Sequence, residues 1–333
     1  RNARRRHQGG VRQLQRLSSY LRSRSDATDF AMSTELRSRA GLTPHPKPTP
    51  ASPDASASTL APALSGECIA FDGLNCYVAG HGPPLLLVHS VNAAASAAEM
   101  RPLFDRYRYT RTVFAIDLPG FGLSDRSDRD YTPRLMTDAL HSTVAEIRRR
   151  CGPLPIAGVA VSLGTEFLAR AAVERPDQWD RLALVSPTGL NGHQARRGPE
   201  GSTRGIAGMH ALLSVPLWSE SLFRLLTRPA VVRYFLERTW GGRVIDEKLW
   251  AYDVQTARQP GARFAPLHFL SGNLFSADIH RVYEGISQPV WMSHGVRGDF
   301  TDYRNQKIVE ARSNWRIDTF KTGALPYFEV PDE

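Results

Sequence analysis

A serine lies where the sequence changes abruptly from a buried strand to a helix, and this junction constrains the fold more than any other stretch. The apolar run 154–161 predicts a buried strand, and the apolar positions from Leu163 onward follow helical spacing. A serine in so sharp a turn needs small residues two positions away on each side, and Ala160 and Gly164 supply them. Such a turn presents a hydroxyl at the edge of the sheet, so Ser162 is the candidate nucleophile.

Short apolar strands alternate with helices on both sides of this junction, a pattern typical of a mostly parallel sheet covered by helices on both faces. The expected strands are residues 67–71 and 75–78, joined as a hairpin at Asp72-Gly73, and then 85–88, 113–116, 154–161, 182–185, 290–292 and 315–320. Helices are expected over residues 93–107, 135–147, 163–171 and 307–311. The sequence therefore predicts an α/β fold built on one doubly covered sheet.

The alternation stops between residues 191 and 285, where helical stretches rich in aromatic residues replace it; Trp240 and Trp250 are examples. Strand and helix alternation then resumes. We therefore expect a helical layer over 191–285, inserted between two parts of one core, residues 65–190 and 286–333.

Residues 1–64 differ in composition from the rest of the chain. Ten Arg and three acidic residues within positions 1–40 account for seven of the nine net positive charges of the protein. Six prolines then fall among Ala, Ser and Thr between positions 43 and 64. Because such segments bury little apolar surface, we expect a disordered basic and Pro/Ser-rich tail over 1–64 that adds nothing to the core. The positive charge therefore belongs to this tail and does not predict a nucleic-acid partner.

Cysteine content and hydropathy bear on location. Three cysteines with no repeated spacing predict neither a disulfide framework nor a metal site. No apolar stretch approaches the ~20 residues of a membrane span. These features favour a cytoplasmic protein. Residues 1–31 are best explained as sequence upstream of a start at Met32, and the alternative is an organelle transit peptide.

The order of these parts resembles the α/β-hydrolase superfamily, particularly its helical-cap branch of epoxide hydrolases, haloperoxidase-like esterases and carbon–carbon bond hydrolases. Three segments within residues 67–333 carry the resemblance. They are Leu85–Ser90, Asp117–Gly122 followed by Ser124-Asp125, and the turn around Ser162. In this family such a turn is called the nucleophile elbow.

The resemblance implies a role for each of three residues at or near the elbow. Ser162 would be the nucleophile, and the backbone N–H groups of Val91 and Leu163 would form the oxyanion hole. Ser90 stands where this branch usually has glycine.

The resemblance also implies a catalytic acid shortly after the strand that ends at Met292. Family members commonly place Asp three residues beyond a His-Gly pair, whereas here Asp299 follows His294-Gly295 one position late. Asp302 is the alternative acid, and a turn residue is the competing explanation for Asp299.

The last loop departs most from the family pattern. That loop typically reads Gly-His-x-Pro-x-x-Glu-x-Pro, and residues 323–331 of this chain read Gly-Ala-Leu-Pro-Tyr-Phe-Glu-Val-Pro. Ala324 therefore occupies the position of the catalytic histidine. A serine hydroxyl without an adjacent base is a poor nucleophile near pH 7, so the ordinary acyl-transfer rate should be largely lost.

Four other histidines are candidate surrogate bases. His89 and His294 fall at strand ends on the predicted site edge, where each could instead hold its own loop by hydrogen bonds. His268 and His193 lie in the helical layer and could approach from above.

The sequence excludes several enzyme classes. A dehalogenase of this fold needs Asp at position 162, and no dinucleotide, phosphate-loop or metal-ligand motif is present. We expect a cofactor-free serine hydrolase or lyase acting on a small apolar ester or ketone under the cap. The alternative is a non-catalytic member that binds a ligand or partner. The family's final helix would begin at residues 332–333, so truncation there is also expected to leave apolar surface exposed.

Overall fold

The computed structural model describes residues 60–298 and 302–333, which form an eight-stranded sheet in the order β1-β2-β4-β3-β5-β6-β7-β8. The strands are β1 (Glu67–Phe71), β2 (Leu74–Ala79), β3 (Pro84–Val88), β4 (Thr112–Asp117), β5 (Ile156–Val161), β6 (Trp179–Val185), β7 (Val290–Gly295) and β8 (Trp315–Phe320). Strands β3 to β8 run parallel, and β2 is antiparallel to both β1 and β4. The predicted hairpin is confirmed, with Asp72 and Gly73 both at positive φ (49° and 74°) in its turn.

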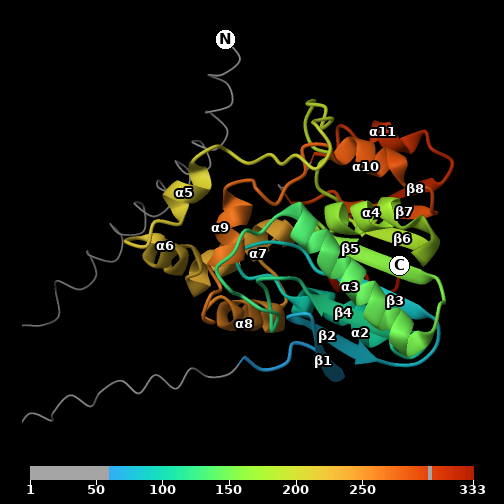
Figure 1. Cartoon of the computed structure of the whole chain (residues 1–333), viewed down its shortest axis with the longest axis horizontal. Coiled ribbons are helices and arrows are strands. Elements are labelled where there is room, and N and C mark those ends of the chain that lie inside the picture. The colour runs from blue at the N-terminus through green and yellow to red at the C-terminus, as the bar shows by residue number, and fades with distance from the viewer. Residues whose placement is uncertain (1–59, 299–301) are drawn as a thin grey trace, which may run out of the picture. The chain divides into compact units, whose positions relative to one another are not determined.

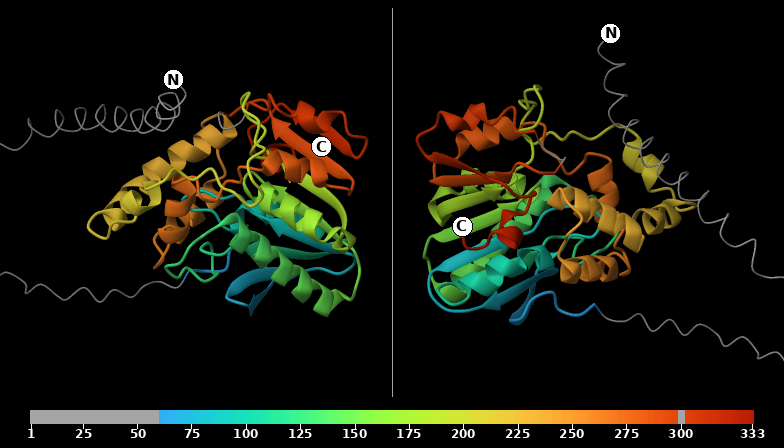
Figure 2. Two further views of the ribbon diagram at one scale, coloured as in Figure 1. Left: turned by 45° about the horizontal axis from the view of Figure 1, so that its top comes forward. Right: turned by 180° about the vertical axis from the view of Figure 1, so that it is seen from behind.

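Helices cover both faces of the sheet (Figure 1). The helices between β3 and β6 are the 3₁₀ helix η1 (Ala97–Met100), α2 (Arg101–Tyr107), α3 (Pro133–Cys151), α4 (Gly164–Glu174) and the 3₁₀ helix η2 (Pro176–Gln178). The view from behind in Figure 2 shows α2 together with the C-terminal helix α12 (Pro326–Glu329), on the face opposite to α3 and α4.

Alternate residues of each central strand pack into the two layers. Leu86 and Val88 of β3 pack in the core beneath α3 and α4, whereas Leu85 and Leu87 pack in the core beneath α2. A strand buried on both faces needs apolar residues at successive positions, and β3 is wholly buried. The expected α/β-hydrolase architecture, a mostly parallel and doubly covered sheet, is confirmed.

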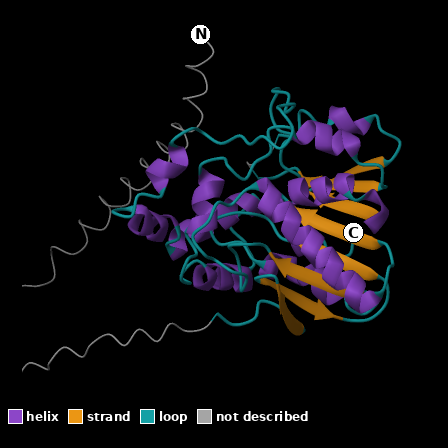
Figure 3. Ribbon diagram, in the orientation of Figure 1, coloured by secondary structure: helices purple, strands orange, loops and turns teal. Residues whose placement is uncertain are grey.

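Residues 186–289, between β6 and β7, form the helical insert. Its helices are α5 (Met209–Leu213), α6 (Ser219–Leu226), α7 (Pro229–Trp240), α8 (Glu247–Thr256), α9 (Phe264–Leu270) and α10 (Ile279–Gly285). Figure 3 shows the insert as helices and loops, with α7, α8 and α9 beyond the end of the sheet toward which the central strands point. By contrast, α10 packs against α4, and Ile279 and Tyr283 belong to the main core. After β7 the chain adds α11 (Lys307–Glu310) before β8.

The packed part of the chain begins earlier than the composition predicts. Leu60 and Leu64 fall within the expected tail, yet both are buried. The Ala63 N–H donates to the Tyr77 hydroxyl at 3.0 Å, and the Tyr252 hydroxyl donates to the Ala61 carbonyl at 2.7 Å. These partners lie far along the chain, so local composition could not reveal them. The prediction for residues 1–59 lies outside the described residues.

Within residues 60–298 and 302–333, no helix has the length and apolar character needed to cross a membrane.

Candidate active site

The elbow has the backbone strain expected of a nucleophile turn. Ser162 follows β5 directly and has φ of 51°, in the left-handed region that non-glycine residues rarely adopt. Its N–H donates to the Val185 carbonyl at 2.9 Å, and its carbonyl accepts from the Thr165 N–H at 3.2 Å. A Cβ at Gly164 would lie 2.4 Å from the His89 carbonyl oxygen. The small residue predicted there is therefore required by the close approach of the loop after β3.

Two backbone N–H groups near this turn are available to a ligand. Leu163 precedes the first residue of α4, and within the part of the chain that the structure describes its N–H has no hydrogen-bond partner. The Val91 N–H likewise has no partner among the described residues. The positive end of the α4 dipole adds to the field at the turn. Val91 and Leu163 therefore remain the candidate donors for an oxyanion, because a free backbone N–H is the group that such a site requires.

Glu99 of η1 clamps the loop that carries Val91. Its carboxylate accepts from the Ser90 N–H at 2.8 Å, the Ser90 hydroxyl at 2.8 Å and the Asn92 amide at 2.9 Å. The Asn92 side chain in turn accepts from the Ala94 N–H at 2.7 Å. The serine that replaces the usual glycine therefore has a buried charged partner, which fixes the backbone on both sides of it.

Hydrogen bonds to the loop after β4 and to its own loop occupy the two ring nitrogens of His89. The Leu118 N–H donates to His89 Nε2 at 3.0 Å, so Nδ1 carries the proton and donates to the Ser90 carbonyl at 2.5 Å. The ring is fully buried. His89 therefore holds the loop that carries Ser90 and Val91, and it has no free nitrogen to accept a proton from a serine.

His294 is held in a similar way at the end of β7. Its Nδ1 lies 3.2 Å from the Gly295 carbonyl, its Nε2 lies 3.4 Å from the Thr319 hydroxyl, and its ring stacks on Tyr303 at 3.9 Å.

His268 and His193 also have partners away from the elbow. His268 Nδ1 lies 3.3 Å from the Asn273 amide, and its ring stacks on His210 at 3.6 Å. Burial, followed by the positive charge of His210, lowers the pKa of His268 to about 4. His193 Nε2 lies 3.2 Å from the Arg304 guanidinium. The structure therefore brings none of the four candidate histidines into hydrogen-bond contact with Ser162 within the described residues.

The loop that carries Ala324 lies next to the elbow. The Ser186 hydroxyl, one residue beyond the Val185 carbonyl that binds Ser162, donates to the Ala324 carbonyl at 2.6 Å. The Ala324 N–H donates to the Thr239 carbonyl of α7 at 2.8 Å. A short side chain at position 324 is therefore fixed beside the strand end whose carbonyl binds the Ser162 N–H.

The two acid candidates have different outcomes. Asp299 lies outside the described residues. Asp302 accepts from the Gly192 N–H at 2.6 Å and forms an ion pair with Arg304 at 3.2 Å. The Gly192 hydrogen bond is the main cause that lowers the pKa of Asp302. Its carboxylate stabilises a loop of the helical insert.

Two further buried polar groups surround Glu99. Asp253 of α8 is 2% exposed and its Oδ1 has no hydrogen-bond partner among the described residues. Burial, with the nearby Glu99 charge next, raises the pKa of Asp253 well above its usual range. The Tyr327 hydroxyl of α12 is also buried without a described partner. Glu99, which holds the loop of Ser90 and Asn92, therefore lies near two buried polar groups that have no hydrogen-bond partner among the described residues.

The partners of Glu166 lie outside the turn at Ser162. Its carboxylate accepts from the Thr188 hydroxyl at 2.6 Å and the Ser276 N–H at 2.8 Å, and lies 3.7 Å from the Arg204 guanidinium. Burial raises the pKa of this fully buried carboxyl. Glu166 therefore joins α4 to the helical insert.

Sequence reasoning missed Glu99 and Ser186. A carboxylate near the start of an otherwise apolar helical stretch was a signal for Glu99, but its partners are set by tertiary packing. Ser186, with φ of 49°, stands at the end of β6, the edge on which ligands of such sheets bind. Within residues 60–298 and 302–333, no group of three or more His, Cys, Asp or Glu residues could hold a metal ion.

Solved structures share the fold at low sequence identity. The 2-hydroxy-6-oxo-6-phenylhexa-2,4-dienoate hydrolase of Rhodococcus sp. strain RHA1 is 18% identical with a TM-score of 0.59, and the match covers 78% of this chain and 90% of that one. The N-formylmaleamic acid deformylase of Pseudomonas putida S16 is 19% identical with a TM-score of 0.55, over 80% and 97%. E-2-(acetamidomethylene)succinate hydrolase is 17% identical with a TM-score of 0.54, over 78% and 91%.

No protein with a curated description matches the chain. The sequence model of the alpha/beta hydrolase family matches residues 81–333, which include the elbow and the altered last loop, and the chain belongs to this family.

Proposed function

We propose that the protein is a cofactor-free serine hydrolase in which Ser162 is the nucleophile and the usual imidazole base is absent. The observation that carries the proposal is the pair of unpartnered N–H groups, on Val91 and Leu163, beside a serine with a left-handed backbone. In this proposal residues 191–285 form a cap over a core of 65–190 and 286–333.

The substrate class follows from the chemistry left at the site. Without a base, attack by Ser162 is fastest on a carbonyl that has a good leaving group or is already electron-poor, so small activated esters and ketones are favoured. One structural neighbour is named for a 6-oxo substrate, which supports keeping ketones in the class. Removing one triad member still leaves about 10³- to 10⁴-fold acceleration over water from the oxyanion hole and binding.

Hydrolysis of p-nitrophenyl acetate tests this proposal. We expect a rate about 10³-fold above that of buffer, with a transient acetyl adduct on Ser162 detectable by intact-protein mass spectrometry. Ser162→Ala should remove both signals. Equal rates for the wild type and Ser162→Ala would contradict the proposal.

The second candidate function is ligand or partner binding without turnover. It is favoured by one observation, that His89, His294 and His268 are all engaged in other contacts. This candidate predicts no acetyl adduct in either the wild type or Ala324→His.

A further inference from the structure

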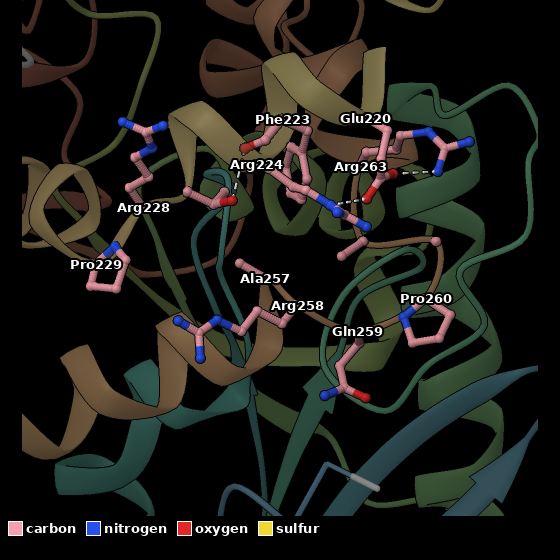
Figure 4. Close-up of a pocket in the computed structure, with 13 residues that line it drawn as sticks. Glu220, Phe223, Arg224, Arg228, Pro229, Ala257, Arg258, Gln259, Pro260 and Arg263 are labelled. Atoms are coloured by element: carbon pink, nitrogen blue, oxygen red, sulfur yellow. Dashed lines mark hydrogen bonds and ion pairs between the residues drawn. The ribbon is translucent and has the colours of Figure 1, made fainter. Parts of the chain in front are cut away.

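A pocket of about 660 Å³ opens in the helical insert, between the start of α6, the start of α7 and the loop that joins α8 to α9. Its volume lies within the range of small-molecule sites. Figure 4 shows arginines from all three of these segments among the residues that line it, together with Phe223 and Pro229. The complete lining is Glu220, Phe223, Arg224, Thr227, Arg228, Pro229, Ala257, Arg258, Gln259, Pro260, Gly261, Ala262 and Arg263.

Positive charge in the lining exceeds negative charge by three, since four arginines face one glutamate. Glu220 is already saturated, because one carboxylate oxygen accepts from Arg224 at 2.9 Å and the other from Arg263 at 2.8 Å. Arg228 and Arg258 are exposed, and their guanidinium groups have no ion pair or hydrogen bond within the described residues. In Figure 4 no dashed line reaches either of them. The uncompensated charge is therefore concentrated on these two side chains.

The start of α7 adds to this positive potential. Arg228 is the N-cap residue of the 12-residue helix, and Pro229 is its first residue; both line the pocket. Neither supplies a side-chain cap, and among the described residues no side chain makes a capping hydrogen bond at this end of the helix dipole.

The walls of the pocket are fixed to the core. The Arg126 guanidinium donates to the Thr256 carbonyl at 2.8 Å, and a Cβ at Gly261 would lie 2.3 Å from the Arg126 carbonyl oxygen. Phe223, Ala257 and Ala262 form one apolar cluster with Ala94, which lies in the loop after β3. The wall of the pocket is therefore preformed, with its apolar residues packed into the protein.

We propose that this pocket binds a small organic polyanion, with two or more negative charges held by Arg228 and Arg258 and its apolar part against Pro229. Guanidinium groups bind phosphate and carboxylate through paired N–H donors, so either head group satisfies the chemistry. The site does not use Ser162, so it is independent of the proposed hydrolysis.

Isothermal titration of the full chain with inorganic pyrophosphate and, separately, with citrate tests the site at constant ionic strength. We expect saturable binding of at least one probe, which also distinguishes a phosphate from a carboxylate ligand. Arg228→Gln/Arg258→Gln should weaken that binding at least ten-fold, because each substitution removes a charged hydrogen-bond donor to the ligand.

Arg316→Gln is the matched control, because it removes one surface arginine of β8 that pairs with Asp318 outside this lining. It should bind the probe like the wild type, and so should Ser162→Ala. The inference is overturned if neither probe binds above the level of chloride, or if the double variant and Arg316→Gln bind equally. A thermal melt of each variant confirms that a loss of binding is not a loss of folding.

Discussion

The two halves of the candidate active site differ in how completely their expected groups are present. On the proposed oxyanion side, Glu99, His89 and Gly164 fix the loop and the turn that carry the Val91 and Leu163 N–H groups. On the acid–base side, Ala324 stands beside the end of β6, and Asp302 is bonded to Gly192.

This difference separates two components of catalysis that normally occur together. The oxyanion side needs only backbone geometry, which the strand-to-helix turn and the Glu99 clamp supply. The acid–base side needs a titratable ring with one free nitrogen, and the candidate histidines have their nitrogens or their rings in other contacts. A chain can therefore keep electrostatic stabilisation of an oxyanion while lacking proton transfer.

Restoring the histidine should have the largest effect. Ala324→His places an imidazole on the loop that Ser186 holds next to the elbow, so we expect ester hydrolysis to rise about 10²- to 10⁴-fold, or about 3 to 5 kcal/mol of transition-state stabilisation. Initial rates on p-nitrophenyl acetate measure the gain, and adding Ser162→Ala should abolish it.

The acid that orients a restored histidine can be identified in the same background. Asp302→Asn should leave the gain unchanged, since its carboxylate is held by Gly192 and Arg304, whereas Asp299→Asn should reduce it. A reduction by Asp302→Asn alone would reverse this assignment.

Breaking the Glu99 clamp should have the next largest effect. Glu99→Ala leaves the Ser90 N–H and the Asn92 amide without their acceptor in a buried site, so the free energy of unfolding should fall by about 3 kcal/mol. Urea denaturation measures this loss. Glu99→Gln keeps one acceptor oxygen and should cost about half as much, and a cost below 0.5 kcal/mol for Glu99→Ala would argue against the clamp.

Replacing Asp253 should raise the free energy of unfolding, whereas replacing Glu99 should lower it. Because its pKa is raised in the folded state, folded Asp253 holds its proton more tightly than unfolded Asp253, and stability is lost as pH rises above about 4. Asp253→Asn should therefore raise the free energy of unfolding by about 1 to 2 kcal/mol at pH 7, with no gain near pH 4. Denaturation at both pH values checks this. Asp246→Asn on the same helix is the control and should be destabilising, because it loses the ion pair with Arg101.

His268 should give the smallest effect. Its folded pKa of about 4 lies below that of the unfolded chain, so stability is present above pH 6.5 and is lost as pH falls from about 6.5 to 4. His268→Gln should remove about 1 kcal/mol of this acid destabilisation and leave ester hydrolysis unchanged. A loss of activity in His268→Gln would identify His268 as a displaced base. It would contradict the view that the acid–base half of the site lacks a base.

The sequence predicted the parts of the site that depend on local geometry. Ser162, Ala160 and Gly164 lie on one turn, and the apolar strands before them follow a period that needs no distant partner. The hydrogen-bond partners of the histidines lie far away in the sequence, such as Leu118 for His89 and Thr319 for His294. The sequence alone therefore could not show whether a histidine is free to act as a base. Glu99 was missed for the same reason.

Reactivity of Ser162 toward a fluorophosphonate tests the central claim most directly, because the probe needs the oxyanion hole and an activated hydroxyl but no particular substrate. Intact-protein mass spectrometry would give the labelling rate of the wild type, Ala324→His and Ser162→Ala. We predict slow labelling of the wild type at Ser162, labelling at least 10²-fold faster in Ala324→His, and none in Ser162→Ala. Equally fast labelling of the wild type and Ala324→His would contradict the account, because it would show that another group in the chain already acts as the base.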